Sequence, residues 1–129
     1  LGVASELRQR QWAIHEPSNE TFQAFLKELE LGFRQRVGLD EYAARVGCSP
    51  STLARACHAA TQRAGKTLID ERVALEARRL LVHSPATVAD IASNLGFSEA
   101  TNFVKFFKRL TGETPQQFRA RATGRPQGP

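Results

Sequence analysis

The chain has 129 residues, enough for one domain or two very small ones. Hydrophobic residues make up 41% and charged residues 24%, which suits a globular protein, and no apolar run approaches the roughly 18 residues of a membrane span. The net charge of +5 favours polyanionic partners without identifying one. The excess lies in the second half: residues 65–129 carry 10 basic and 6 acidic side chains, against 8 and 7 in residues 1–64.

Two cysteines, Cys48 and Cys57, limit the chemistry that the chain can perform. Neither belongs to a CxxC motif or a His/Cys cluster, so no zinc, other metal or cofactor is expected. Both fall in helix-forming sequence among apolar neighbours, which is typical of small buried hydrophobes in a reducing, cytoplasmic compartment. No signal peptide is visible. Because the chain starts with Leu1 and contains no Met, we expect a piece of a longer protein.

The first 48 residues predict a lead-in and two helices. Residues 1–18 are polar and are expected to be mostly irregular. From Thr21 to Arg36 the sequence favours a helix, because apolar residues recur at helical spacing on one face. These residues are Phe22, Phe25, Leu26, Leu29 and Phe33. Gly38 ends this helix, and the stretch DEYAARV follows as a short second one before Gly47 breaks the chain.

Capping signals place the next two helices. Ser49 is the predicted N-cap and Pro50 the first residue of a helix that runs to about Ala60. After a turn near residues 62–64, a longer helix extends from about Lys66 to Val82 and is stopped by Ser84-Pro85. Its apolar stripe is expected to contain Leu68, Ile69, Val73, Leu75, Ala77, Leu80 and Leu81.

Three more helices complete an all-α fold of about seven helices. Thr87–Asp90 resembles a capping box and opens a helix from Val88 to Leu95. Gly96 turns the chain, and Ser98 or Glu99 starts a helix to about Leu110 that Gly112 ends. A second capping box, Thr114 to Gln117, opens a final helix to about Arg121. Residues 122–129 are read as a flexible tail, and no period-two strand pattern occurs.

Two segments of the sequence repeat each other. Tyr42-Ala43 and Val46-Gly47 match Ile91-Ala92 and Leu95-Gly96 at an offset of 49, and Ser49 is paired with Ser98. Beyond the turn the offset becomes 50, so that Leu53, Arg55, Cys57 and Gln62 match Phe103, Lys105, Phe107 and Gly112. An alanine that allows close helix crossing, a turn glycine, a cap and a helix with one apolar side together indicate a helix-turn-helix. The sequence therefore predicts two such units.

The length of the helix between the two units is comparable to the spacing of major grooves on DNA. At about 1.5 Å per residue, Lys66 to Val82 spans about 26 Å, whereas successive major grooves on one face of DNA lie about 34 Å apart. A rigid helix of that order would hold two recognition helices in adjacent grooves. A monomer that reads both grooves is expected.

The second half resembles the C-terminal DNA-binding domain of AraC/XylS-type transcription regulators. The motifs that carry the likeness are E-A-R-R-L-L, I-A-x-x-L-G-F-S, F-x-K-x-F-K-R and G-x-T-P-x-x-F-R, within residues 75–119. The resemblance implies a homeodomain-like fold and a bacterial protein that lies in the cytoplasm, at the nucleoid. It also implies double-stranded DNA and RNA polymerase as partners, a monomeric isolated domain, and a full-length protein that can dimerise.

The likeness covers about residues 37–121. It implies a first helix-turn-helix over 39–62, a linker helix over 66–82, a second helix-turn-helix over 88–111 and a closing helix over 115–121. Residues 1–36 look like the connection to an absent N-terminal domain that binds an effector or mediates dimerisation. The first unit departs from the family pattern at Cys48, Cys57 and Gln62, where aromatic or large apolar residues and a glycine are common.

Outward positions of the two recognition helices are the candidate DNA contacts. In the first, the core face should hold Leu53, Ala56 and Cys57, and the outward face Ser51, Thr52, Ala54, Arg55 and His58. In the second, Phe103, Phe106, Phe107 and Leu110 fit a core stripe, and the outward face holds Ala100, Thr101, Asn102, Val104, Lys105 and Lys108. Arg55 suits guanine and Asn102 suits adenine. Lys105 matches Arg55 in the repeat.

Phosphate contacts are expected at helix N-termini and from flanking basic residues. The candidates are Thr87, Arg109, Thr114 and Gln117. Ordinary helix capping explains Thr87, Thr114 and Gln117 equally well. Arg119, Arg121 and Arg125 would add general attraction to DNA.

Two other functions stay open at this point. A helical protein-interaction module that has lost DNA binding is kept open by the alanine-rich stretch PSTLARACHAA. The second alternative is the DNA-binding part of a DNA-alkylation repair regulator, because this domain type is also found fused to methyl-accepting modules. Cys48 and Cys57 lack neighbours that would activate a thiolate, so enzymatic activity of the chain itself is not expected.

Overall fold

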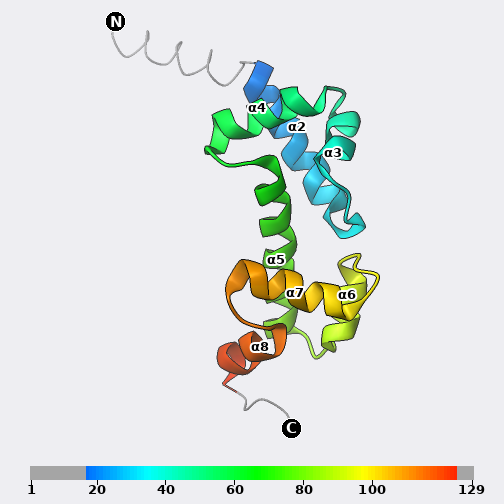
Figure 1. Cartoon of the computed structure of the whole chain (residues 1–129), viewed down its shortest axis with the longest axis vertical. Helices are drawn as coiled ribbons and strands as arrows, with labels where there is room; N and C mark the ends of the chain where they lie inside the picture. Colours follow the sequence, from blue (N-terminus) through cyan, green and yellow to red (C-terminus); the bar gives the residue numbers. More distant parts are fainter. Residues whose placement is uncertain (1–16, 125–129) are drawn as a thin grey trace, which may run out of the picture. The chain divides into compact units, whose positions relative to one another are not determined.

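A computed structural model describes residues 17–124 of the chain (Figure 1), and all regular secondary structure within this range is helical. The chain divides into two compact units. The described part of the first unit comprises residues 17–31 and 37–68, and that of the second comprises residues 32–36 and 69–124. The chain therefore enters the second unit briefly before it builds most of the first.

Helix α2 (Pro17–Gly32) opens the first unit, and η1 (Phe33–Gln35) follows it as a short 3-10 helix. The prediction of one helix from Thr21 to Arg36 was thus wrong at both ends. Gly32 has a poor helix propensity, so the α-helix ends there, and Arg36 closes η1 in the left-handed conformation with φ 55°. The predicted irregular lead-in lies outside the described residues, except for Pro17 and Ser18, which belong to α2.

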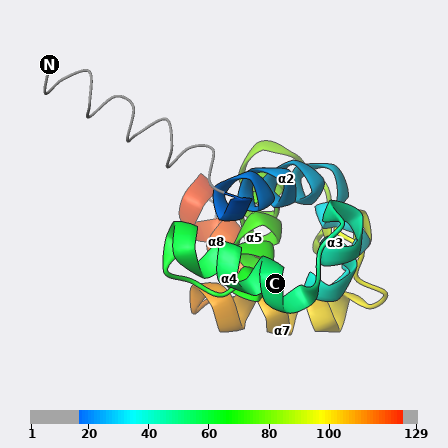
Figure 2. The same cartoon turned by 90° about the horizontal axis from the view of Figure 1, so that it is seen from above.

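The first unit continues with α3 (Leu39–Val46) and α4 (Pro50–Thr61), which pack against each other (Figures 1 and 2). Its core contains an edge-to-face pair, Phe25 and Tyr42, with ring centroids 5.6 Å apart. The remaining buried side chains of this core include Phe22, Leu29, Ala43, Leu53, Ala56 and Cys57. Leu26 was predicted in the same stripe, but its position at the edge of the helix face leaves it 38% exposed.

Helix α5 (Gly65–His83) extends one residue beyond the predicted helix at each end, and its residues from Ile69 onward belong to the second unit. The predicted stripe is buried at Ile69, Val73, Ala77 and Leu81. Leu75 was wrongly included and is 56% exposed. Two residues after Val73 at about 100° per residue, it points to the opposite side of the helix.

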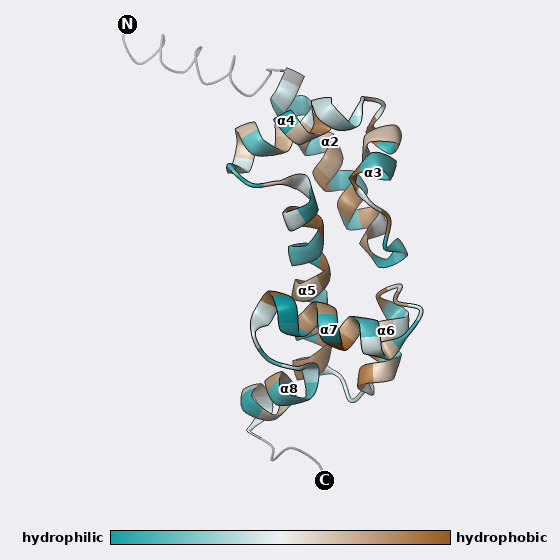
Figure 3. Cartoon of the chain, in the orientation of Figure 1, coloured by the Kyte–Doolittle hydropathy of each residue, from teal (hydrophilic) through white to brown (hydrophobic). Residues whose placement is uncertain are grey.

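The second unit contains α6 (Val88–Asn94), α7 (Ala100–Thr111) and α8 (Pro115–Thr123), and α7 packs on both of the others. Its core is aromatic, with Phe97 5.3 Å from Phe103 and Phe107 5.6 Å from Phe118 between ring centroids. Polar and apolar residues alternate along α7 (Figure 3), as expected for a helix with one buried side. Because α8 extends to Thr123, the tail predicted over residues 122–129 starts too early.

No helix within residues 17–124 is both long and apolar enough to cross a membrane.

Candidate nucleic-acid interface

The turn of the first unit has the predicted helix-turn-helix geometry. Gly47 adopts φ +92°, and the N–H groups of Gly47 and Cys48 both donate to the carbonyl of Ala43, at 2.8 and 3.0 Å. Ser49 then caps α4, accepting a hydrogen bond from the Thr52 N–H at 3.1 Å, and Pro50 occupies the first helical position. The buried Ala43 and the turn glycine together set the direction in which α4 leaves the turn.

The outward face of α4 carries a small polar network at its N-terminal end. The Ser49 hydroxyl donates to Thr52 Oγ1 at 2.9 Å, and the Arg55 guanidinium donates to the same oxygen at 3.4 Å. Ser51, Arg55 and His58 are exposed, whereas Thr52 and Ala54 are half-buried. The core positions Leu53, Ala56 and Cys57 are buried as predicted. Arg55 is thus directed outward from a helix whose opposite side is held in the core.

The second turn resembles the first but contains one more residue. Gly96 adopts φ +86°, and the Phe97 N–H donates to the Ala92 carbonyl at 2.9 Å, matching the bond from Cys48 to Ala43. The N-cap of α7 is Glu99, whose side chain makes no capping bond. Ser49 therefore corresponds in the fold to Glu99 rather than to Ser98, and Ser98 is the inserted residue of the second turn.

Helix α7 presents the polar face that its sequence predicts. Phe103, Phe106 and Phe107 are buried and Leu110 is half-buried. On the other side, the exposed residues are Thr101, Asn102, Lys105 and Lys108, and the half-buried ones are Ala100 and Val104. The ends of α4 and α7 also match: Thr61 donates to the Cys57 carbonyl and Thr111 to the Phe107 carbonyl, both at 2.8 Å. Arg55 and Lys105 consequently occupy equivalent positions on equivalent helices.

The phosphate candidates have in-chain partners. Thr87 caps α6, accepting from the Asp90 N–H at 3.0 Å. Thr114 and Gln117 form a complete capping box, with bonds of 2.8 and 3.1 Å. Arg109 is exposed, and its Nη2 lies 4.0 Å from Asp70 Oδ2. A phosphate at either helix start would therefore meet mainly backbone N–H groups, since the side chains are already engaged.

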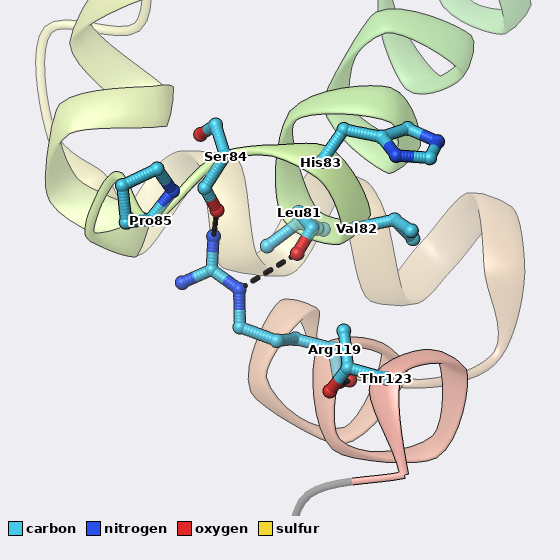
Figure 4. A pocket seen from close by; sticks show the side chains of 7 residues that line it. All are labelled: Leu81, Val82, His83, Ser84, Pro85, Arg119 and Thr123. Carbon is cyan, nitrogen blue, oxygen red and sulfur yellow. Dashed lines mark hydrogen bonds between the residues drawn. The ribbon is translucent and has the colours of Figure 1, made fainter.

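Two other basic residues have partners within the chain. Arg119 donates to the carbonyls of Leu81 and Ser84, at 2.9 and 3.2 Å, and so fastens α8 to the end of α5 (Figure 4). A hollow of about 360 Å³ surrounds this contact. Arg121 pairs with Glu113 at 2.7 Å, and this hydrogen bond lowers the pKa of Glu113 and raises that of Arg121. Arg125 lies outside the described residues.

Two further titratable groups bear on what the domain can do. A side-chain hydrogen bond from Arg79, at 2.6 Å, lowers the pKa of the buried Glu76 despite its burial. For Cys57, burial is the main cause of a raised pKa, with Cys48 adding to it, so the reactive thiolate is disfavoured. In the part of the chain that the structure describes, no group of three or more His, Cys, Asp or Glu residues is placed to hold a metal.

Sequence reasoning missed two residues of the surface beside α7, Arg36 and Ser98. A hollow of about 490 Å³ beside α7 is lined on its polar side by Arg36, Ser98, Asn102, Lys105 and Arg109. Arg36 precedes the first helix-turn-helix, and its placement depends on a contact distant in sequence. The only local signal was the cluster of arginines in GFRQR, which the helical pattern of Thr21–Arg36 concealed.

Comparison with known proteins supports this geometry. Residues 42–121 match a family described as helix-turn-helix domain. The chain belongs to that family, in its AraC/XylS-type branch. It is thus an AraC-type DNA-binding domain of the helix-turn-helix class found in transcription regulators.

Relatives with curated names include the HTH-type transcriptional activator RhaS of Escherichia coli O157:H7. It is 32% identical over 104 residues, which are 81% of this chain and 37% of that protein. The regulatory protein PocR of Salmonella typhimurium is 27% identical over 103 residues, or 80% of this chain and 34% of PocR. An uncharacterised HTH-type regulator of Staphylococcus aureus is 31% identical over 91 residues, 70% of this chain but only 12% of that protein. The chain spans about a third or less of these relatives.

Solved structures agree with the family fold. The DNA-binding domain of AdpA, a global transcriptional factor crystallised with a target DNA, superposes with a TM-score of 0.69 at 26% identity, covering 81% of this chain and 98% of that one. The C-terminal domain of AraT, a response regulator from Geobacillus stearothermophilus, gives a TM-score of 0.72 at 21% identity, covering 82% of this chain and 86% of that one. The latter shares the fold.

Proposed function

We propose that this domain binds double-stranded DNA with sequence specificity and places α4 and α7 in successive major grooves. The observation that carries the proposal is the duplication itself. Two equivalent helices each bury one side and expose a polar side that starts after a glycine turn, with Arg55 and Lys105 at the same position of each. This is the arrangement in which a helix-turn-helix presents its second helix to base edges. The crystallised complex of AdpA with a target DNA supports it.

Each exposed residue has a role in this proposal. Arg55 donates two hydrogen bonds to guanine, and Asn102 recognises adenine from the first turn of α7. Lys105 contacts a base or a phosphate, Thr101 reaches base edges, and Lys108 and Arg109 hold phosphates. The backbone at the starts of α6 and α8 adds phosphate contacts. Ser51, Thr52 and His58 flank Arg55 on the first surface.

The two units are proposed to contribute unequally. Among its outward residues α4 offers Ala54, with Ala59 and Ala60 exposed beyond it, whereas α7 offers Asn102, Lys105 and Lys108. A helix with fewer long side chains makes fewer base contacts. We therefore assign the larger share of sequence recognition to α7 and a positioning share, with Arg55 as the main contact, to α4.

The domain forms the DNA-reading part of a longer regulator in this proposal. Its curated relatives are more than twice its length, which leaves room for a domain that binds an effector or mediates dimerisation. RNA polymerase is the second partner proposed for the whole protein.

Selection from random duplexes tests the proposal. The chain, Arg55→Ala and Lys105→Ala are each incubated with a random pool, and bound duplexes are sequenced. Lys27→Ala is the matched control, because Lys27 is exposed on α2 outside both helix-turn-helix units. We expect a motif of two blocks about one helical turn apart, with Lys105→Ala relaxing one block strongly and Arg55→Ala the other more weakly.

Two results would count against parts of this proposal. A single block that only Lys105→Ala disturbs would restrict α4 to positioning. No enrichment, together with no salt-dependent affinity, would overturn DNA reading and favour an interaction module built on the alanine-rich α4.

A further inference from the structure

The segment Gly32–Arg36 belongs to the second unit although it precedes the first helix-turn-helix in sequence. It is held there by several contacts. Phe33 is buried, and the Arg72 guanidinium lies 4.0 Å from its ring centroid. Arg34 pairs with the buried Glu76 at 2.5 Å and donates to Asn94 Oδ1 at 3.2 Å. The segment is therefore packed into the second unit and forms part of its surface around α6 and α7.

The closest approach is at the second turn. A Cβ placed on Gly96 would lie 2.1 Å from the Arg34 carbonyl oxygen and 2.8 Å from Arg36 Cγ. The turn glycine thus serves two purposes: it adopts a positive φ, and it leaves room for the backbone of the segment. This packing brings Arg36 beside the turn from which α7 starts.

Arg36 is fixed at that place by aromatic rings and a carboxylate. Its guanidinium lies 4.4 Å from the Phe97 ring centroid and 4.9 Å from that of Phe106. Its Nη1 is 3.9 Å from Asp70 Oδ1, and its side chain remains 29% exposed. Asp70 also lies 4.0 Å from Arg109, so one buried carboxylate holds two arginines side by side. The Arg36 guanidinium is therefore already held in one orientation when no ligand is bound.

The polar lining of the hollow of about 490 Å³ is suited to an anion. Arg36, Lys105 and Arg109 supply three positive charges, and Ser98 and Asn102 supply hydrogen-bond donors. Asp70 compensates one charge and leaves an excess of two. A guanidinium that is already stacked and oriented loses little conformational entropy on binding an oxygen anion, and its donors match phosphate geometry.

We propose that this hollow binds one backbone phosphate of a DNA duplex and that Arg36 supplies the contact from outside both helix-turn-helix units. The inference rests on the proposed function, because it requires that the face of α7 with Asn102 and Lys105 meets DNA. It makes the residues before the first helix-turn-helix part of the DNA-reading surface of the second.

Salt dependence of DNA affinity tests the proposal. The duplex selected by the wild-type chain is titrated at several salt concentrations with wild type, Arg36→Ala, Arg36→Lys and Arg34→Ala. Each neutralised phosphate contributes roughly 0.9 to the slope of log affinity against log salt. We expect Arg36→Ala to lower the slope by about one and the affinity roughly tenfold at low salt. Arg36→Lys keeps the slope because it keeps the charge.

Arg34→Ala separates a phosphate contact from a purely structural role. Arg34 fastens the segment through Glu76 and Asn94 and does not line the hollow. Its removal is expected to lower affinity, if at all, without changing the slope. An Arg36→Ala variant that also keeps the wild-type slope would overturn the phosphate site and leave Arg36 a structural clamp. A wild-type chain without salt-dependent binding would instead overturn the proposed function.

If Arg36→Ala does not fold, a second experiment tests the proposal. One phosphate of the duplex at a time is replaced by a neutral methylphosphonate, and binding of the wild type and of Arg36→Lys is measured. One phosphate should exist whose neutralisation weakens binding of the wild type more than that of Arg36→Lys, because lysine cannot bind it bidentately. If every methylphosphonate affects both proteins equally, the site is not occupied by a DNA phosphate. Circular dichroism of each variant confirms that the helices remain folded.

Discussion

The two turns of this domain share a left-handed glycine and a returning hydrogen bond, and they differ in what surrounds them. Gly47 and Gly96 adopt φ values of +92° and +86°, and each is followed by a residue whose N–H returns to a buried alanine. Around Gly47 the space is open, with no atom within 4 Å of a Cβ placed there. Around Gly96 the chain is crowded by the Arg34 carbonyl. A repeated motif can thus be a free surface turn in one copy and a packing site in the other.

The recognition helices also differ, in the size of the side chains that they bury. At equivalent positions α4 buries Cys57 and α7 buries Phe107. In the second unit Phe97 and Phe118 extend the aromatic cluster, whereas Cys48 stands at the position of Phe97 in the first. The larger core of the second unit holds a helix with more polar reading residues, which agrees with its larger proposed share of recognition.

Truncating the equivalent core residues should give the largest contrast. Phe107→Ala is expected to reduce the free energy of unfolding by about 3–5 kcal/mol, because it removes a buried ring and leaves a cavity. Cys57→Ala removes a single heavy atom and should cost only about 1 kcal/mol. Urea denaturation of both variants measures the difference. Equal losses would contradict the view that the second unit depends on its aromatic core.

The turn glycines provide the next contrast. Gly47→Ala places an alanine in the left-handed region and should cost about 1 kcal/mol. Gly96→Ala adds a collision with the Arg34 carbonyl, so we expect a total of about 2–4 kcal/mol. Unfolding of the two variants in urea, under identical conditions, measures the two losses of free energy. A Gly96→Ala protein as stable as Gly47→Ala would mean that the segment Gly32–Arg36 does not pack on the turn in solution.

Local signals in the sequence were sufficient to predict most of the helical architecture. Ser49-Pro50 and Thr114-Pro115 placed two helix starts correctly because an N-cap acts on the residues next to it. The spacing of phenylalanines from Phe103 to Phe107 predicted the core face of α7 because a helix has a fixed period. The outward positions of both recognition helices followed from the same periodicity.

Long-range contacts could not be predicted in this way. Nothing next to Arg36 in sequence indicates Phe97, Phe106 or Asp70 as partners, so its place in the second unit was missed. The bonds of Arg119 to the carbonyls at the end of α5 were also missed, because they depend on how α8 packs. Charge and exposure expected from sequence do not distinguish an arginine that binds a partner from one that fastens two helices.

Helix caps should show a smaller difference than the cores or turns. Ser49→Ala removes one capping bond to the start of α4, and Thr114→Ala breaks a capping box at α8 in which both side chains participate. Each loss is expected to cost about 1 kcal/mol. Thermal unfolding followed by circular dichroism measures both. Glu99→Ala is the matched control, since the N-cap side chain of α7 makes no capping bond and its removal should change the stability little.

The smallest expected contrast is in how the free energy of unfolding changes at acidic pH. Glu76 of the second unit has its pKa lowered, chiefly by the hydrogen bond from Arg79. A carboxyl whose folded pKa lies below its unfolded value of about 4.3 stabilises the fold above that pH, and this stability is lost as the pH falls through the folded pKa. We therefore expect the free energy of unfolding to fall more steeply between about pH 5 and pH 3 in the wild type than in Glu76→Gln.

Glu41→Gln, on an exposed carboxylate of α3 in the first unit, is the control for that acid titration. Glu41 lies 3.5 Å from Arg45 on the helix surface, where solvent screens the pair. Urea denaturation at each pH should show the Glu41→Gln protein following the wild type while Glu76→Gln departs from it. The reverse result would place the acid-sensitive contact in the first unit. It would also remove Glu76 as the carboxylate that links Arg34 to α5, because that pair depends on the same ionised side chain.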